Sequence, residues 1–560
     1  MTATEPVASE VQTAPEEQVT PEEPPAPVVR PLILIRGFGG PNVAEEQRSP
    51  YQGYSEGTVY PGKRGENYIY EGFLLRALKS DRYPYTDATN VVGYYADDVS
   101  ALDDPDDWAP DALSGSIVID PPTARRVLRD GSAGTMWVYR YYDLTPRQML
   151  RYGAGLVRLI TLIKAAAERH GETFAGVDII AHSMGGLVLR EALRQFQAAE
   201  HGSAGRMIHR IVTLGTPHRG IAFQRIPDWV LERLPGIDKA EDEIASFDPA
   251  ATGFLEFAEC FPIERVLTVV GTNYRSYAVP GASGMNRMSS LLDEGSAVYN
   301  RSDGLVKQSA AQLPGAPRTF VHKCHGGPDS LVTSREAYEI AMRFFHGTHR
   351  VRLWLDQAEV SRGKDWFGRS EFYFATSIKP RYVDFDLFHQ SVEAENCYGP
   401  FSKADLTDGP PDLAAELTKS LAEPGDRTTG WAGPDRLIWE GRVDGRAKPD
   451  TAALGLVFRL DLYLGERDSH GIGFSDNVIF RKQYYVQAFP GDDLALFVHT
   501  GEQHLSALKP KSRQELEELA EDGPAAAVQR PRKVDGGWTF AVQGTGFEAT
   551  FRLAITPDAD

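Results

Sequence analysis

The chain has 560 residues, of which 42% are hydrophobic, 10% aromatic and 24% charged, and these fractions are typical of globular proteins. Because this length exceeds one ordinary hydrophobic core, we expect two or more domains. Lys and Arg total 59 while Asp and Glu total 78, so the formal charge is −19, and a surface this acidic argues against a nucleic-acid partner.

Residues 1–30 are rich in Pro, Glu and Thr and poor in large apolar residues. Such a segment cannot offset its ordering entropy, so we expect a disordered tail. It lacks the basic start and apolar core of a secretory signal, and the sequence contains no apolar run of about 18 residues that would span a membrane. The expected compartment is therefore the cytoplasm.

From residue 31 to residue 348, short apolar runs alternate with amphipathic helical patterns. The run 31–35 ends in a glycine-rich loop, as a strand buried on both faces does. Further strands are expected at 136–142, 177–182, 207–217, 264–273 and 319–324, and helices at 70–82, 146–169, after residue 183 and at 334–347. This alternation predicts an α/β domain with a mostly parallel sheet flanked by helices.

After residue 348 the pattern changes to a period of two, with aromatic and branched residues alternating with polar ones. About eight such segments are separated by Gly, Pro and Asp turns: 350–360, 370–378, 435–443, 454–464, 477–487, 493–500, 537–542 and 547–555. This spacing predicts an all-β sandwich over 349–560, with a long loop at 401–433. The segment 350–378 also loosely resembles calcium-dependent lipid-binding sandwiches, in which Asp365 and Glu371 would lie near a metal loop.

The stretch VDIIAHSMGG, residues 177–186, places a serine between an apolar strand and a helical pattern. A sharp strand-to-helix turn exposes the hydroxyl of Ser183 and requires small residues on either side, here Ala181 and Gly185. A serine hydroxyl is a weak nucleophile unless a base takes its proton and a third group orients the base. We therefore expect Ser183 to be a nucleophile and look for its partners.

These residues resemble the nucleophile elbow of α/β-hydrolase lipases and esterases. VTLGTPHRG (212–220) is similar to the strand that follows in the same lipases, and PLILIRGFGG (31–40) is similar to their first core strand and oxyanion loop, although Arg36 stands where the family usually has His. The resemblance covers about residues 31–347. It implies a serine nucleophile, then an acid, then a histidine along the chain.

The acid is expected on a loop beyond the strand that ends near residue 273. Asp303, in SDGLV, is similar to the acid loop of lipases, and the glycine after it allows the loop to turn. The alternatives are that Asp303 only forms a turn with its own backbone, or that Asp248 is the acid.

The histidine is expected between the last strand and the last helix of the α/β domain. His325 lies there, followed by two glycines, and His322 is the alternative three residues earlier. His182 and His218 are excluded as the base, His182 because it should point away from the pocket side of the turn. His346 belongs to the closing helix and is expected at the surface.

Two backbone amides are expected to stabilise the oxyanion. Met184 supplies one, because the first N–H groups of a helix have no intrahelical acceptor. The resemblance implies that Phe38 supplies the other. The resemblance also places residues 221–262 at the cap position of α/β hydrolases, where an apolar helix either covers an acyl site or only packs as an insertion.

The sequence thus predicts a serine hydrolase of carboxylic esters, with a lipid-like or other acyl ester as its small-molecule partner and no cofactor. Acyl transfer on the same three residues is one alternative. A binding or scaffolding protein with a vestigial hydrolase domain is the other. The acidic segment 96–111 lacks the residue order of a calcium-binding loop. The three cysteines, Cys260, Cys324 and Cys397, lack zinc-ligand spacing and are expected to be buried free thiols. No metal is therefore expected. The sequence does not determine the oligomeric state.

Overall fold

A computed structural model gives the fold of the chain. The residues that it describes are 29–37, 70–80, 83, 88–91, 131–139, 141, 148–219, 257–274, 302–313, 315–327, 329–360, 370–380, 385–390, 394, 398–401, 437–445, 455–468, 477–489, 494–500 and 512–558.

The first part of the chain forms a parallel sheet of seven described strands in the order β2-β3-β1-β4-β5-β6-β7. The strands are β1 (Leu32–Ile35), β2 (Ala88–Val91), β3 (Met136–Tyr139), β4 (Val177–His182), β5 (Ile208–Leu214), β6 (Val266–Gly271) and β7 (Arg318–Val321). The strand order changes direction beside β1, and ligands of such sheets bind beyond the carboxyl ends of the strands.

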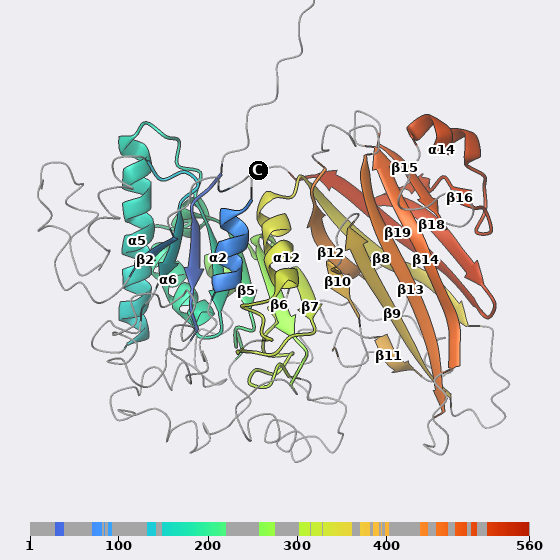
Figure 1. Cartoon of the computed structure of the whole chain (residues 1–560), viewed down its shortest axis with the longest axis horizontal. Coiled ribbons are helices and arrows are strands. Elements are labelled where there is room, and N and C mark those ends of the chain that lie inside the picture. Colours follow the sequence, from blue (N-terminus) through green and yellow to red (C-terminus); the bar gives the residue numbers. More distant parts are fainter. Residues whose placement is uncertain are drawn as a thin grey trace, which may run out of the picture.

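Helices cover both faces of this sheet (Figure 1). They are α2 (Glu71–Leu78), α5 (Met149–Arg169), α6 (Gly185–Ala199), α7 (Ser203–Met207), α10 (Phe257–Cys260) and α12 (Arg335–His346), with a 3-10 turn at Ile263–Arg265. Successive residues of β1 enter opposite cores: Ile33 and Ile35 pack with α5 and α6, whereas Leu32 and Leu34 belong to the cluster that includes α2 and α12. Full burial on both faces explains the uninterrupted apolar run of β1.

The second part of the chain forms two antiparallel sheets. One has the order β10-β9-β13-β14-β15-β16, with β11 also paired to β9, and the other has the order β12-β8-β19-β18-β17. The strands are β8 (His349–Val360), β9 (Ser370–Pro380), β10 (Phe388–His389), β11 (Tyr398–Phe401), β12 (Leu437–Val443), β13 (Leu456–Asp468), β14 (Asn477–Phe489), β15 (Ala495–His499), β16 (Val528–Gln529), β17 (Arg532–Val534), β18 (Gly537–Gly544) and β19 (Phe547–Pro557).

Aromatic side chains join the inner faces of the two antiparallel sheets. Phe374 of β9 and Phe480 of β14 lie 5.9 and 4.9 Å, ring centre to ring centre, from Phe547 of β19. A helix, α14 (Arg513–Leu519), begins with a capping box at Ser512 and buries Leu516 against the antiparallel sheet that contains β15 and β16. The predicted fold class, an α/β-hydrolase sheet followed by a β-sandwich, is confirmed.

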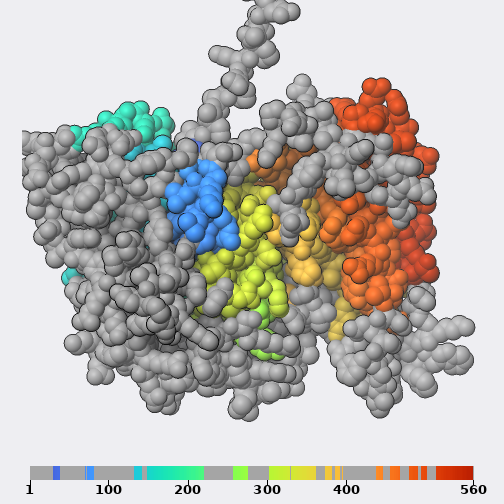
Figure 2. Space-filling model, viewed as in Figure 1, coloured from blue at the N-terminus to red at the C-terminus, as the bar shows by residue number. Residues whose placement is uncertain are grey.

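The two parts of the chain share one hydrophobic cluster, which runs from α2 and α12 into the sandwich strands. Figure 2 shows α2 and α12 side by side on one face, next to the sandwich strands. At the edge of the parallel sheet, the Thr319 hydroxyl of β7 donates to the Leu387 carbonyl oxygen at 2.8 Å. The division near residue 348 is therefore a change of architecture within a continuous apolar interior.

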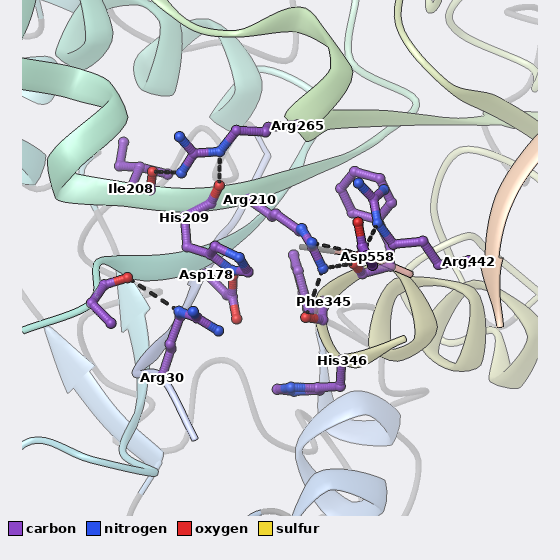
Figure 3. A network of polar contacts seen from close by, with 12 residues as sticks. Arg30, Asp178, Ile208, His209, Arg210, Arg265, Phe345, His346, Arg442 and Asp558 are labelled. Atoms are coloured by element: carbon purple, nitrogen blue, oxygen red, sulfur yellow. Dashed lines mark hydrogen bonds and ion pairs between the residues drawn. The ribbon is translucent and has the colours of Figure 1, made fainter. Parts of the chain in front are cut away.

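A buried ion network also crosses this junction (Figure 3). Asp558 follows β19, and its Oδ2 accepts hydrogen bonds from Arg210 of β5 at 2.7 Å and Arg442 of β12 at 2.5 Å. Arg210 also donates to the carbonyl oxygens of Phe344 and Phe345 at the end of α12. Both guanidinium groups are nearly inaccessible to solvent, so the Asp558 charge is needed between them.

Replacing Asp558 with asparagine should lower the free energy of unfolding by about 3 kcal/mol or more, because it removes the carboxylate from between two buried cations. The matched control is Glu200→Gln, which breaks an exposed pair with Arg206 and should cost under about 1 kcal/mol. Urea denaturation of both variants measures the difference. Equal costs would show that the buried network does not hold the two parts together.

The predicted elements are present with ends that differ from the expected ones by no more than about four residues, but several short elements were missed. The missed elements have no long apolar pattern, and they are the strands β2, β10, β11, β16 and β17 and the short helices α7, α10 and α14. Several predictions fall outside the described residues: residues 1–28 of the disordered tail predicted for 1–30, the acidic segment 96–111, most of the cap (221–256), most of the loop at 401–433, and Asp365. Within the described ranges, no helix combines the length and apolarity that crossing a bilayer requires.

Candidate active site

Ser183 lies at the tight turn between β4 and α6. Its φ is 53°, in the left-handed region that non-glycine residues rarely adopt. The Ser183 N–H donates to the Leu214 carbonyl oxygen of β5 at 3.0 Å, which ties the turn to the neighbouring strand. A Cβ on Gly185 would lie 2.5 Å from the Arg36 carbonyl oxygen, so a small residue is required there, as the sequence predicts.

His325 and Asp303 extend from Ser183 in one line of hydrogen bonds. The Ser183 Oγ lies 2.9 Å from His325 Nε2, and His325 Nδ1 lies 2.8 Å from Asp303 Oδ2. A carboxylate can only accept a hydrogen bond, so the proton of the neutral ring lies on Nδ1. Nε2 then has a lone pair directed at the serine hydroxyl, which is the arrangement that a general base needs.

The Asp303 carboxylate is held in place by its own loop. Its Oδ1 accepts from the backbone amides of Leu305 at 3.0 Å and Val306 at 2.8 Å, which leaves Oδ2 for the histidine. The His325 N–H also donates to the Asp303 carbonyl oxygen at 2.9 Å. Backbone and side chain together fix the histidine relative to the acid.

Two glycines that the sequence analysis did not single out make room for the acid and the histidine. Gly215 follows β5 with φ 54°, and a Cβ there would lie 2.8 Å from Asp303 Oδ2 and 3.2 Å from His325 Nδ1. A Cβ on Gly271, at the end of β6, would lie 2.7 Å from the Asp303 Cβ. The sequence signal that could have identified them is the Gly-Thr pair that follows or ends each of these two strands.

The other candidate histidines do not contact Ser183 in any described hydrogen bond. His322 Nδ1 is 3.1 Å from the Thr272 hydroxyl, and His218 Nε2 is 2.9 Å from the Thr213 hydroxyl. His182 Nε2 bonds instead to the backbone of His325. The surface position expected for His346 is wrong, because its ring is half-buried against Tyr83, 3.3 Å from the phenol oxygen.

Acid should destabilise the fold through His218. Burial, aided by repulsion from Arg190, lowers the pKa of His218 from 6.5 to about 3. Between pH 6.5 and about pH 3, His218 binds a proton in the unfolded chain but not in the folded chain. Its contribution to the free energy of unfolding is therefore fully present above about pH 6.5 and is lost as the pH falls.

At pH 5 the free energy of unfolding should be about 2 kcal/mol lower than at neutral pH, because the solution pH lies about 1.5 units below the pKa of a histidine in the unfolded chain. Urea titrations at pH 7 and pH 5 measure it, and His218→Gln should show a smaller difference between the two. An unchanged difference in that variant would exclude His218 as the source.

The predicted oxyanion donors are only partly within the described structure. Met184 is the N-cap residue of α6, where amides have no intrahelical acceptor. Phe38 lies outside the described residues. Gly37, just before it, is so close to the turn that a Cβ would lie 2.8 Å from the Ser183 Cβ, so the end of the first strand passes directly over the serine.

The described side chains include no group of three or more His, Cys, Asp or Glu residues arranged to hold a metal ion. Cys324 is a buried free thiol and Cys260 is half-buried, while Cys397 and the alternative acid Asp248 lie outside the described ranges. Burial, with a contribution from the nearby Asp329, raises the pKa of the Cys324 thiol to about 11, so this sulfur is not a nucleophile near neutral pH.

One family model matches the part of the chain that contains the turn at Ser183. Residues 141–230, which include β4, Ser183 and α6, match the family model of the PGAP1-like alpha/beta domain. The chain is also similar to the Bacillus licheniformis lipase BlEst2 in its propeptide form (12% identity, TM-score 0.27, 73% of this chain and 95% of that one) and in its mature form (18%, 0.25, 46% and 89%). No curated protein matches the chain.

Proposed function

We propose that this chain, which carries an α/β-hydrolase domain of the lipase and esterase type, is a serine hydrolase that cleaves carboxylic esters. The observation that carries the proposal is the pair of short contacts, 2.9 Å from Ser183 to His325 and 2.8 Å from His325 to Asp303. Together with the strained turn at Ser183, these contacts meet the geometric requirements for an activated serine.

In the proposed reaction, His325 Nε2 takes the proton from the Ser183 hydroxyl as Oγ attacks the ester carbonyl carbon. Asp303 keeps the ring in the Nδ1–H tautomer and stabilises the positive charge that the ring acquires. The carbonyl oxygen becomes an oxyanion, which the amides of Met184 and Phe38 would stabilise; one such donor typically contributes about 3 kcal/mol to catalysis.

The tetrahedral intermediate then breaks its bond to the alcohol oxygen, and His325 gives the proton to the departing alcohol. Ser183 is left acylated. Water enters, gives a proton to His325 and attacks the acyl carbon, after which the acid leaves and Ser183 regains its proton. We propose lipid-like or other acyl esters as the substrate class, on the resemblance of the sequence segments 31–40, 177–186 and 212–220 to lipases.

A fluorophosphonate probe tests the proposal, because it reacts covalently with activated serines. The full chain should be labelled at Ser183, found by peptide mass spectrometry, and should hydrolyse nitrophenyl butyrate. Adding a primary alcohol to the assay separates hydrolysis from acyl transfer, since a transferase would form the new ester. A folded chain that neither reacts with the probe nor cleaves a series of nitrophenyl esters would overturn the proposal and favour a binding or scaffolding role.

A further inference from the structure

We propose that His182, the residue before the serine, is a positioning residue that holds the His325 loop and the end of the first strand at a fixed separation. The proposal rests on the proposed function, because the loop it holds carries the base. The sequence excludes His182 as the base itself, and the geometry gives it this different task.

On one side, the imidazole of His182 contacts the base loop twice. Its Nε2 lies 2.9 Å from the carbonyl oxygen of His325, and the two ring centres are 4.8 Å apart. A carbonyl oxygen only accepts, so Nε2 of His182 must be the donor. The backbone of the base is thus held by a side chain that is fixed to the nucleophile by a single peptide bond.

On the other side, the same ring faces Gly37 at the end of the β1 segment. A Cβ on Gly37 would lie 2.9 Å from His182 Nδ1 and 2.8 Å from the Ser183 Cβ, so the first strand's end packs directly against both residues. His182 is nearly inaccessible to solvent. One buried ring therefore separates the segment that leads to Phe38 from the loop that carries His325.

The surroundings of the ring also favour its neutral form. Burial above all, with repulsion from His325 and Arg36, lowers the pKa of His182 well below its usual value, although the hydrogen bond to the His325 backbone acts in the opposite direction. A neutral ring places no positive charge beside the base. A lysine or arginine at this position would supply a donor but not this neutrality.

The hydrogen bond sets the expected behaviour of variants. His182→Leu fills similar space but has no donor, so the base loop should shift. A displacement of about 1 Å between reacting groups costs about 100-fold, and we expect kcat to fall between about 10-fold and 100-fold with KM nearly unchanged. His182→Gln keeps an N–H at a similar reach, so its kcat should stay within about fivefold of the native value.

The control is His209→Gln, which replaces another buried histidine, at the opposite end of the neighbouring strand β5. His209 bonds to Asp178 at 2.8 Å rather than to the base loop. This variant should change stability without changing kcat. Thermal unfolding of all three variants identifies any loss that is due to unfolding alone.

A second readout does not depend on activity. In protein labelled with 15N-histidine, the Nδ1–H proton of His325, held between the ring and Asp303, should give a slowly exchanging downfield NMR signal. The signal should persist in His182→Gln and broaden or disappear in His182→Leu. If His182→Leu keeps both the signal and the native kcat, the positioning role is wrong. If the native chain has no hydrolase activity but the signal changes as described, the proposed function fails and the positioning role stands.

Discussion

Replacing Ser183 with alanine should lower esterase turnover about a millionfold, the loss typical of a serine nucleophile that acts with its base as a unit. Alanine removes only the Oγ that lies 2.9 Å from His325 Nε2. The strained backbone at φ 53° and the Leu214 hydrogen bond are kept, so the free energy of unfolding should be nearly unchanged. Steady-state hydrolysis of nitrophenyl butyrate and fluorophosphonate labelling measure the effect.

Ser203→Ala is the matched control for this change. Ser203 is also buried, but its hydroxyl bonds to the Phe196 carbonyl oxygen near the end of α6, far along the helix from the proposed nucleophile. This variant should keep native turnover and lose some stability. Turnover by Ser183→Ala within tenfold of the native rate would remove Ser183 from the mechanism.

Asp303→Asn should lower turnover about ten-thousandfold, because it reverses the tautomer of His325. The two backbone amides of Leu305 and Val306 point at Oδ1 and would hold the asparagine oxygen there. The asparagine NH2 would then face His325 Nδ1, which must become an acceptor. The ring proton moves to Nε2, so His325 has no lone pair there to take the proton of the serine hydroxyl.

Asp178→Asn provides a close control, since Asp178 is another buried carboxylate that meets a histidine Nδ1 at 2.8 Å, that of His209. It lies at the start of β4, so its loss should affect stability and leave turnover intact. The comparison also tests the alternative acid. Mild loss in Asp303→Asn together with severe loss in Asp248→Asn would transfer the role of the acid to Asp248.

The local features of the candidate site were predictable from sequence because short-range sterics determine them. The strand 177–182, the small residues 181 and 185 and the helix after them force a tight turn wherever this segment folds. The apolar run of β1 and the face of α5 formed by Leu156, Leu159, Ile160 and Ile163 are likewise fixed by burial and by helical periodicity. The alternating pattern after residue 348 specified the sandwich for the same reason.

Contacts between segments far apart in the sequence could not be predicted from local patterns. Gly215 and Gly271 come from neighbouring strands, and only the packing of β5 and β6 beside the Asp303 loop explains why neither can carry a side chain. His182 reaches a carbonyl 143 positions further along the chain, and Asp558 meets an arginine 348 positions before it. Nothing in the local pattern of these residues indicates such partners.

The sequence by itself determined the order of architectures and the turn at Ser183, since these follow from patterns within short segments, and its resemblance to lipases added the candidates Asp303 and His325. The tertiary structure decided that these three side chains meet, that His346 is half-buried, and that the sandwich shares one apolar interior with the parallel sheet. The physical reason is the range of the interaction. Propensity, periodicity and turn sterics act over a few residues, whereas hydrogen-bond geometry and core packing depend on where distant segments are brought together.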